Sequence, residues 1–249
     1  MISGRYAAWL LAATAIVTVT GPSHAQSAGD GFLFHAPGGS WGVYGGFNRA
    51  SASGDVFAFV TKQLTLNRGD FSSATFGSNL AIRLSPANDI VFDVSVAGVS
   101  RRSEFRDWVD LNNLPIEQTT SLLRVPITLS IKHYLTARGR SISRFAWIPA
   151  ARAAYVGIGA GMMRYRFHQV GDFVDFQTRN VFPDDFKSAA WTPMLQALGG
   201  IEVSLSQSIV LTGEARYTWA RGPMGRDYVG FTRIDLSGIA LTTGLSIRQ

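Results

Sequence analysis

The stretch that decides the fold is residues 119–135, TTSLLRVPITLSIKHYL. Apolar and polar side chains alternate along it almost without a break. One parity carries Leu123, Val125, Ile127, Leu129 and Ile131, and the other carries Arg124, Thr128, Ser130, Lys132 and Tyr134. A period of two predicts a β-strand whose two faces meet different surroundings.

The same alternation recurs in eight segments, which are residues 41–50, 71–85, 89–101, 119–135, 150–168, 190–205, 208–220 and 231–248. In LTGEARYTWA, residues 211–220, the polar parity even holds a carboxylate and a guanidinium, Glu214 and Arg216. The segment 150–168 has glycines on one parity and both aliphatics and arginines on the other, so its facing stays open. The segment 231–248 changes parity, which predicts a β-bulge near Ser237 or Gly238.

The connections between the segments alternate in length. Residues 85–89 and 206–208 form tight turns, whereas residues 51–70, 102–118, 169–189 and 221–230 form longer connections that we expect to be polar. Short periplasmic turns and long outer loops are typical of an outer-membrane barrel. Residues 135–149 are the exception, because they should be periplasmic and yet are long and basic.

The N-terminus has the features of a secretory signal peptide. Arg5 supplies a positive charge, residues 7–20 are apolar, and residues 23–25 (Ser-His-Ala) form a small-residue cleavage site. The apolar run is shorter than the roughly 20 residues that a membrane helix needs. We therefore expect a signal peptide at 1–25, a flexible lead-in at 26–39 and one barrel domain at 40–249.

Composition narrows the class of protein further. The chain has no cysteine, so disulfides cannot stabilise it, and only 16% of its residues are charged, against about 25% in typical soluble domains. The net charge of +6 comes almost entirely from arginine. An exported protein rarely meets nucleic acid, so phosphate-bearing lipids are the expected anionic partners, with lipopolysaccharide among them. The residues expected to contact it are Arg101, Arg102, Arg106, Arg221 and Arg226 in the outer loops.

Alternating strands fit either a soluble barrel with an apolar interior or a membrane barrel with a polar one. An even number of strands, the leader, the turn asymmetry and aromatic residues near strand ends favour the membrane barrel. The aromatic residues expected at the lipid interface are Trp41, Phe47, Tyr155, Tyr165, Tyr217 and Trp219. The predicted fold is all-β, an eight-stranded antiparallel up-and-down transmembrane β-barrel.

A barrel of eight strands is just wide enough for side chains to fill its interior. The charged residues on the polar faces should then neutralise one another there. The expected lumen ion-pair network consists of Arg83, Asp93, Arg124, Lys132, Glu202, Glu214 and Arg216.

Three motifs give the chain a family resemblance: YVGIGAGMMRYRF at 155–167, EARY at 214–217 and IDLSGIALTTGLSIRQ at 234–249. With the strand count, they make residues 41–249 similar to the small eight-stranded outer-membrane β-barrel superfamily, which includes the barrel domains of outer membrane proteins A, X and W. The resemblance implies residence in the bacterial outer membrane and insertion by the barrel assembly machinery. Members usually end in an aromatic residue, whereas this chain ends in Gln249.

Catalytic and metal-binding chemistry is weakly represented. His168, near Asp172 and Asp175, is a conceivable site because some barrels of this kind modify lipid A, but it lacks their His-x-Ser-Asn pattern. Asp172, Asp175, Asp184 and Asp185 match no calcium-loop spacing. The sequence predicts no catalytic residue, no metal and no cofactor.

Function is predicted only broadly. The main hypothesis is a non-enzymatic barrel with a side-chain-filled lumen, which serves envelope structure or surface interaction through its outer loops. One alternative is a small conduit for apolar solutes. A lipid A-modifying enzyme is the other.

Overall fold

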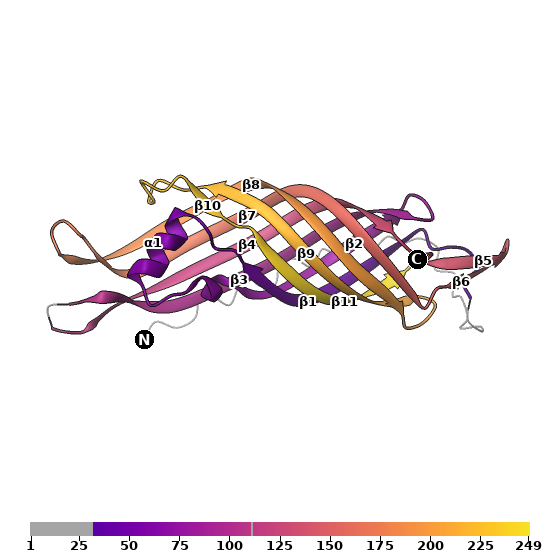
Figure 1. Ribbon diagram of the computed structural model, residues 1–249, viewed down its shortest axis with the longest axis horizontal. Helices are drawn as coiled ribbons and strands as arrows, with labels where there is room; N and C mark the ends of the chain where they lie inside the picture. The colour runs from indigo at the N-terminus through magenta and orange to yellow at the C-terminus, as the bar shows by residue number, and fades with distance from the viewer. Residues whose placement is uncertain (1–31, 111) are drawn as a thin grey trace. The chain divides into compact units, whose positions relative to one another are not determined.

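The barrel is a closed ring of eight antiparallel strands (Figure 1). The computed structural model describes residues 32–110 and 112–249, so the predicted signal peptide lies outside the described residues. The ring consists of β1 (Gly39–Ala50), β2 (Ser73–Arg83), β3 (Asn88–Val109), β4 (Pro115–Tyr134), β7 (Arg152–Val174), β8 (Val181–Ser204), β9 (Ile209–Pro223) and β11 (Gly238–Arg248). Each strand pairs with its neighbours along the chain, and β1 closes the ring against β11, with Trp41 opposite Ile247. The predicted strand number and topology are confirmed.

The two faces of the ring carry opposite chemistry. Large apolar side chains are exposed on the outside, among them Phe76, Leu80, Phe92, Leu129, Ile131, Ile158, Leu195, Leu241 and Leu245. Asp93, Arg124, Lys132 and Glu214 are buried inside. This is the reverse of a soluble barrel, and it matches a wall that lies in lipid, where a closed ring pairs every backbone group. The barrel is a transmembrane barrel.

One end of the barrel, here called the turn end, carries the short connections 84–87 and 205–208. The other, the loop end, carries the connections 51–72, 110–114, 175–180 and 224–232. Among the described residues, no helix is both long and apolar enough to cross a bilayer.

The facing of β7 is now defined. Its glycines point inward. Three arginines point outward, Arg152 at the start of the strand and Arg164 and Arg166 near its middle. A Cβ atom at Gly161 would overlap the carbonyl oxygen of Ile127 on β4, so this close approach of the two strands requires glycine.

Two aromatic residues expected at the lipid interface are inside the barrel instead. Tyr155 and Tyr165 lie on the inward parity of β7 and are fully buried, and their hydroxyl groups have partners there. Trp41, Phe47, Tyr217 and Trp219 do lie on the outer surface, as predicted. Aromatic type alone did not distinguish an interfacial tyrosine from an interior one.

Toward the loop end the strands continue much further than the sequence suggested. Residues 102–118 and 169–189, expected to be polar loops, are mostly strand in β3, β4, β7 and β8. Here Phe105, Ile116 and Phe167 face inward, whereas charged side chains such as Arg102 face outward. The polarity of the two faces therefore inverts along these long strands, as expected where a strand leaves the lipid for water.

The connection 51–72 was also expected to be polar, and this expectation was wrong. It contains α1 (Asp55–Gln63) and η1 (Arg68–Phe71), and both bury apolar side chains. Val56, Phe57 and Val60 lie on one face of α1, and Asp55 and Lys62 at its ends complement the helix dipole. That face packs on an apolar core formed by the loop-end strands, here called the outer core: Leu64, Phe71, Phe105, Ile116, Leu122, Met163, Tyr165, Phe167, Met194, Tyr228, Ile234 and Leu236. It closes the loop end.

The bulge predicted near Ser237 is absent. β10 (Arg233–Asp235) and β11 both pair with β9 in one continuous register, with Asp235 opposite Arg221 and Gly238 opposite Thr218. Ile234 and Leu236 face inward and join the outer core. The apolar residues change parity along 231–248 because the inward face becomes apolar toward the loop end. No bulge residue is needed to explain the change.

At the turn end, the long basic connection 135–151 folds as a hairpin of β5 (Gly139–Ser143) and β6 (Ala146–Pro149). The hairpin lies opposite α1 in the view of Figure 1. Leu33, in the predicted flexible lead-in, pairs with Trp147 through two backbone hydrogen bonds of 2.8 Å. This part of the lead-in is thus held against the hairpin.

Candidate functional site

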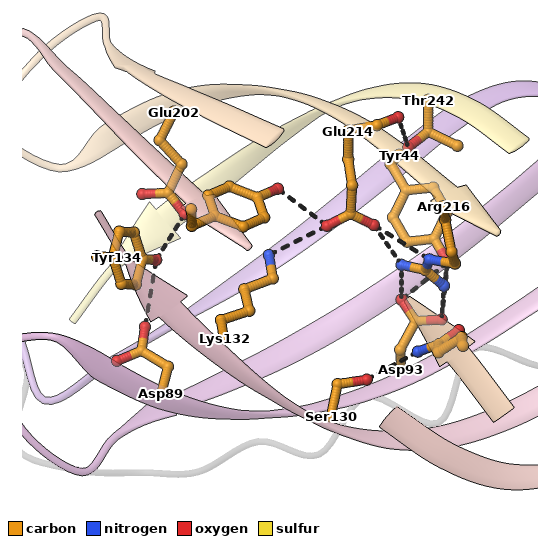
Figure 2. Close-up of polar contacts among 12 residues, drawn as sticks. Tyr44, Asp89, Asp93, Ser130, Lys132, Tyr134, Glu202, Glu214, Arg216 and Thr242 are labelled. Atoms are coloured by element: carbon orange, nitrogen blue, oxygen red, sulfur yellow. Dashed lines mark hydrogen bonds and ion pairs between the residues drawn. The ribbon is translucent and has the colours of Figure 1, made fainter. Parts of the chain in front are cut away.

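The centre of the lumen is organised around Arg216 of β9 (Figure 2). One of its terminal nitrogens lies 2.7 Å from Asp93 Oδ1 on β3, and the other lies 2.7 Å from Glu214 Oε1 on its own strand. Glu214 and Arg216 share the inward face of β9, so they are neighbours two residues apart. Glu214 also lies opposite Gly200 of β8.

Three further side chains complete this central network. Lys132 Nζ on β4 lies 3.4 Å from Glu214 Oε2, and the hydroxyl of Tyr155 donates to the same oxygen at 2.9 Å. The hydroxyl of Tyr44 donates to Asp93 at 2.8 Å. The network thus joins β1, β3, β4, β7 and β9 across the lumen. Its two acids and two bases balance in charge.

A second cluster closes the turn end. Arg138, from the connection before β5, lies 2.7 Å from Asp89 Oδ2, and Tyr134 donates to Glu202 Oε1 at 2.8 Å. Arg248 lies 3.9 Å from Glu202 Oε2, and its guanidinium also sits over the ring of Trp147. This turn-end cluster also balances, with two acids and two bases.

The sequence analysis did not find most of the turn-end cluster. Asp89 begins its segment, and Arg138 lies in a connection, so neither belongs clearly to a strand face. Glu202 was predicted to point inward and does, but it joins this cluster and forms no hydrogen bond or ion pair with the central network. For Arg248 the sequence indicates only a direction: it lies two residues after Ser246, so both side chains share the inward face of the strand.

Two of the arginines expected in the network make no ion pair with a described residue. Arg83 lies at the turn end, where it donates to the carbonyl oxygens of Ser85 and Pro37 at 3.3 and 3.4 Å. Arg124 is 3% exposed, between the outer core and the central network. Its Nε and Nη2 atoms have no hydrogen-bond partner.

The five arginines expected to contact lipopolysaccharide lie toward the loop end and are exposed, but three are engaged within the protein. Arg102 pairs with Glu117, while Arg101 and Arg106 donate to the carbonyl oxygens of Asp70 and Leu66. The side chains of Arg221 and Arg226 have no hydrogen bond or ion pair to another described residue. These two are available to bind an external ligand.

The structure adds three outward-facing arginines that the sequence analysis did not select. Arg164 and Arg166 lie on β7, and Arg233 lies on β10, where it is diagonal to Arg221 of β9, two paired positions away. Arg164 is the cross-strand neighbour of the exposed Trp191, and Arg221 follows Trp219 on the same face. We call Arg164, Arg166, Arg221 and Arg233 the basic rim. It lies next to the aromatic residues, where lipid head groups meet a barrel wall.

His168 is not near the two acids considered with it. Its Nε2 lies 2.5 Å from Asp185, which also contacts Lys187. Asp175 instead closes the connection between β7 and β8. A hydrogen bond from the Thr178 hydroxyl, with others from the N–H groups of Gln177 and Thr178, holds the pKa of Asp175 below its ordinary value. Among the residues the structure describes, no group of three His, Cys, Asp or Glu side chains could hold a metal ion.

Comparisons with known proteins agree on the type of fold. No protein-family model matches the sequence, and no curated protein does. The solved structures that resemble it are small outer-membrane β-barrels. Neisserial surface protein A is 12% identical, with 85% of this chain and 96% of that chain covered and a TM-score of 0.47.

Two further structures are similar in the same way. For the outer membrane protein OprG of Pseudomonas aeruginosa, identity is 13%, coverage is 87% of this chain and 99% of that one, and the TM-score is 0.45. For Ail, the attachment invasion locus protein of Yersinia pestis, identity is 11%, coverage is 86% and 100%, and the TM-score is 0.42.

Proposed function

We propose that this protein is a non-enzymatic barrel of the bacterial outer membrane with a closed lumen, which presents its loop end to the exterior for surface interaction. The observation that carries the proposal is that the interior is filled at three successive levels. The outer core fills the loop end, the central network crosses the middle, and the turn-end cluster lies beneath the β5–β6 hairpin.

The asymmetry of the two ends supports the orientation. Outer-membrane barrels have short turns on the periplasmic side and longer connections outside. The loop end carries the longest connection, 51–72, and its strands continue beyond the apolar belt with charged outer faces. The loop end is therefore assigned to the exterior, and the hairpin to the periplasm.

A planar-bilayer recording of the refolded protein tests whether the lumen is closed. We expect no stable conductance steps, because ions would have to break the central network to cross. A 16-stranded porin in the same bilayer is the control for insertion and detection. Stable, large openings of the unmodified protein would contradict the proposal.

The expected partner at the exterior is lipopolysaccharide, and the basic rim supports this. Arginine binds phosphate through two parallel hydrogen bonds, and the rim lies just beyond the aromatic residues of the outer wall. We expect the unmodified protein to be more stable in bilayers with lipopolysaccharide than in bilayers of phosphatidylethanolamine alone. A variant with Arg164, Arg166 and Arg221 all changed to Gln should lose this difference in stability. Arg102→Gln is the matched control, since Arg102 already pairs with Glu117. Equal stabilisation of the triple variant and the unmodified protein would remove the rim from the proposal.

A conduit for apolar solutes is supported less well, because the charged central network interrupts any continuous apolar path. Leak of an apolar dye from vesicles that contain the protein would favour it. A lipid A-modifying activity would appear as a changed lipid A mass spectrum in cells that express the protein, and we expect no change.

A further inference from the structure

Arg124 is the one inward-facing guanidinium in the described barrel wall that is fully buried and yet has no partner. It lies on β4, between Leu122 of the outer core and Thr128 of the polar interior. Its Nε and Nη2 atoms are buried without a hydrogen bond, and none of the described acids forms an ion pair with it. A charge held in this way is costly unless a counter-ion accompanies it.

The surrounding acids are already neutralised. Asp93 and Glu214 are balanced by Arg216 and Lys132 in the central network. Asp235 is the acid whose charge acts on Arg124, but its carboxylate accepts hydrogen bonds from Ser53 and Ser237 and does not contact the guanidinium. The positive charge of Arg124 therefore remains uncompensated by the described side chains.

Arg124 also lines a cavity. The cavity has a volume of about 30 Å³, and Arg216 lies on its wall together with Asn48, Thr218 and Thr242. Asn48 Oδ1 has no hydrogen-bond partner, so the amide can be turned to direct its NH₂ group into the cavity. Since one water needs roughly 10–15 Å³, the space holds about two or three particles of that size. A tetrahedral phosphate group is larger than this.

We propose that this cavity is a binding site for a single halide ion, chloride under ordinary conditions, with Arg124 as its principal ligand. The guanidinium of Arg124 and the polar N–H and O–H groups of the wall provide the donors. Arg216 is committed to Asp93 and Glu214 and contributes only its positive charge. Met163 and Leu236 on the other side provide an apolar wall that offers the ion no competing contact. The ion neutralises the charge that the protein leaves unpaired.

Crystals of the refolded protein grown in sodium bromide test the site directly. We expect one anomalous-scattering peak in the cavity beside Arg124. Absence of a bromide peak there, with only water density in the cavity, would overturn the proposal. This measurement uses the unmodified protein, so it does not depend on whether a variant folds.

Stability gives an independent test in solution. Urea unfolding is measured at constant ionic strength while bromide replaces gluconate, which is too large for the cavity. Above the dissociation constant, each tenfold rise in bromide should raise the ratio of folded to unfolded protein up to about tenfold. Arg124→Gln should abolish this dependence, and Arg83→Gln, at the solvated turn end, should retain it. The same dependence in Arg124→Gln would show that the halide acts elsewhere.

Discussion

At the scale of single residues, Glu214 has three partners in the central network. Its carboxylate contacts Arg216, Lys132 and Tyr155. Glu214→Ala should destabilise the barrel by about 3–5 kcal/mol, because it leaves two buried cations without their shared acid. Urea titrations of the protein refolded in lipid vesicles measure this loss.

Adding Arg216→Ala should cost less than the sum of the two single changes, since each single variant already breaks their contact. Glu104→Ala, at an exposed position of β3, is the control and should change little. Strictly additive losses would mean that Glu214 and Arg216 do not act as partners.

Asp175 provides a pH-dependent prediction outside the membrane. Its pKa is depressed mainly by the Thr178 hydroxyl, so the turn is stabilised above the ordinary pKa of 3.8 and loses that stabilisation as the pH falls through the depressed value. In Thr178→Val the pKa of Asp175 should rise toward 3.8, and in Thr178→Ser it should stay low. A ¹³C NMR titration of the carboxyl group decides, and an unchanged pKa in Thr178→Val would refute the assignment.

Strand parity indicates from the sequence which way a side chain points. Glu214, Arg216, Asp93 and Lys132 were expected to point inward, and the structure places them in contact in the lumen. The pairing of Asp89 with Arg138 was out of reach, because Arg138 lies in an irregular connection whose path depends on tertiary contacts. Arg124 shows a second limit, since parity gives direction but not a partner.

At the scale of elements, the outer face of β4 lies in lipid along part of the strand and in water toward the loop end. Leu129→Arg should cost about 2–4 kcal/mol, because Leu129 is exposed on the apolar belt. Thr119→Arg lies on the same face of the same strand, beyond the belt, and should be nearly neutral. Refolding titrations compare the two. Equal losses would mean that the polarity inversion does not mark the edge of the bilayer.

The helix α1 depends on Phe57 for its attachment. The ring of Phe57 is fully buried, and its centroid is 4.7 Å from that of Phe71 and 5.9 Å from that of Phe167. Phe57→Ala should cost the loop end about 3–5 kcal/mol, whereas Phe59→Ala, at an exposed ring, should cost far less. Limited proteolysis of residues 51–72 in the folded protein measures the difference. Equal resistance of the two variants to the protease would mean that Phe57 does not hold α1 in place.

The elements that sequence analysis missed share one physical cause. A constant alternation assumes that each face keeps the same surroundings, but the inward face becomes apolar beyond the membrane. The residues of β10 therefore suggested a bulge, and the loop-end parts of β3 and β7 resembled polar loops. The helix α1 was missed because the connection 51–72 has no period-two pattern, and its buried residues are explained only by their packing against the outer core.

At the scale of the whole molecule, strand number, closure and the asymmetry of the ends were predictable, because they depend on counting segments and connection lengths. The three levels of filling were not. The outer core joins residues from Val56 to Leu236, and the turn-end cluster joins Asp89 to Arg248, so both depend on contacts between distant segments. Such contacts leave no periodic signal in the sequence.

The placement of α1 has a consequence for the timing of biogenesis. In the proposed orientation, its apolar face can be covered only after residues 51–72 have crossed the membrane, because Phe105, Ile116 and Phe167 complete the outer core on the far side. An inserted barrel with an uncovered helix must therefore precede the finished protein. We expect a protease added outside to cut residues 51–72 in newly inserted chains and to spare them minutes later. Maturation would then end at the cell exterior, without help from any periplasmic chaperone.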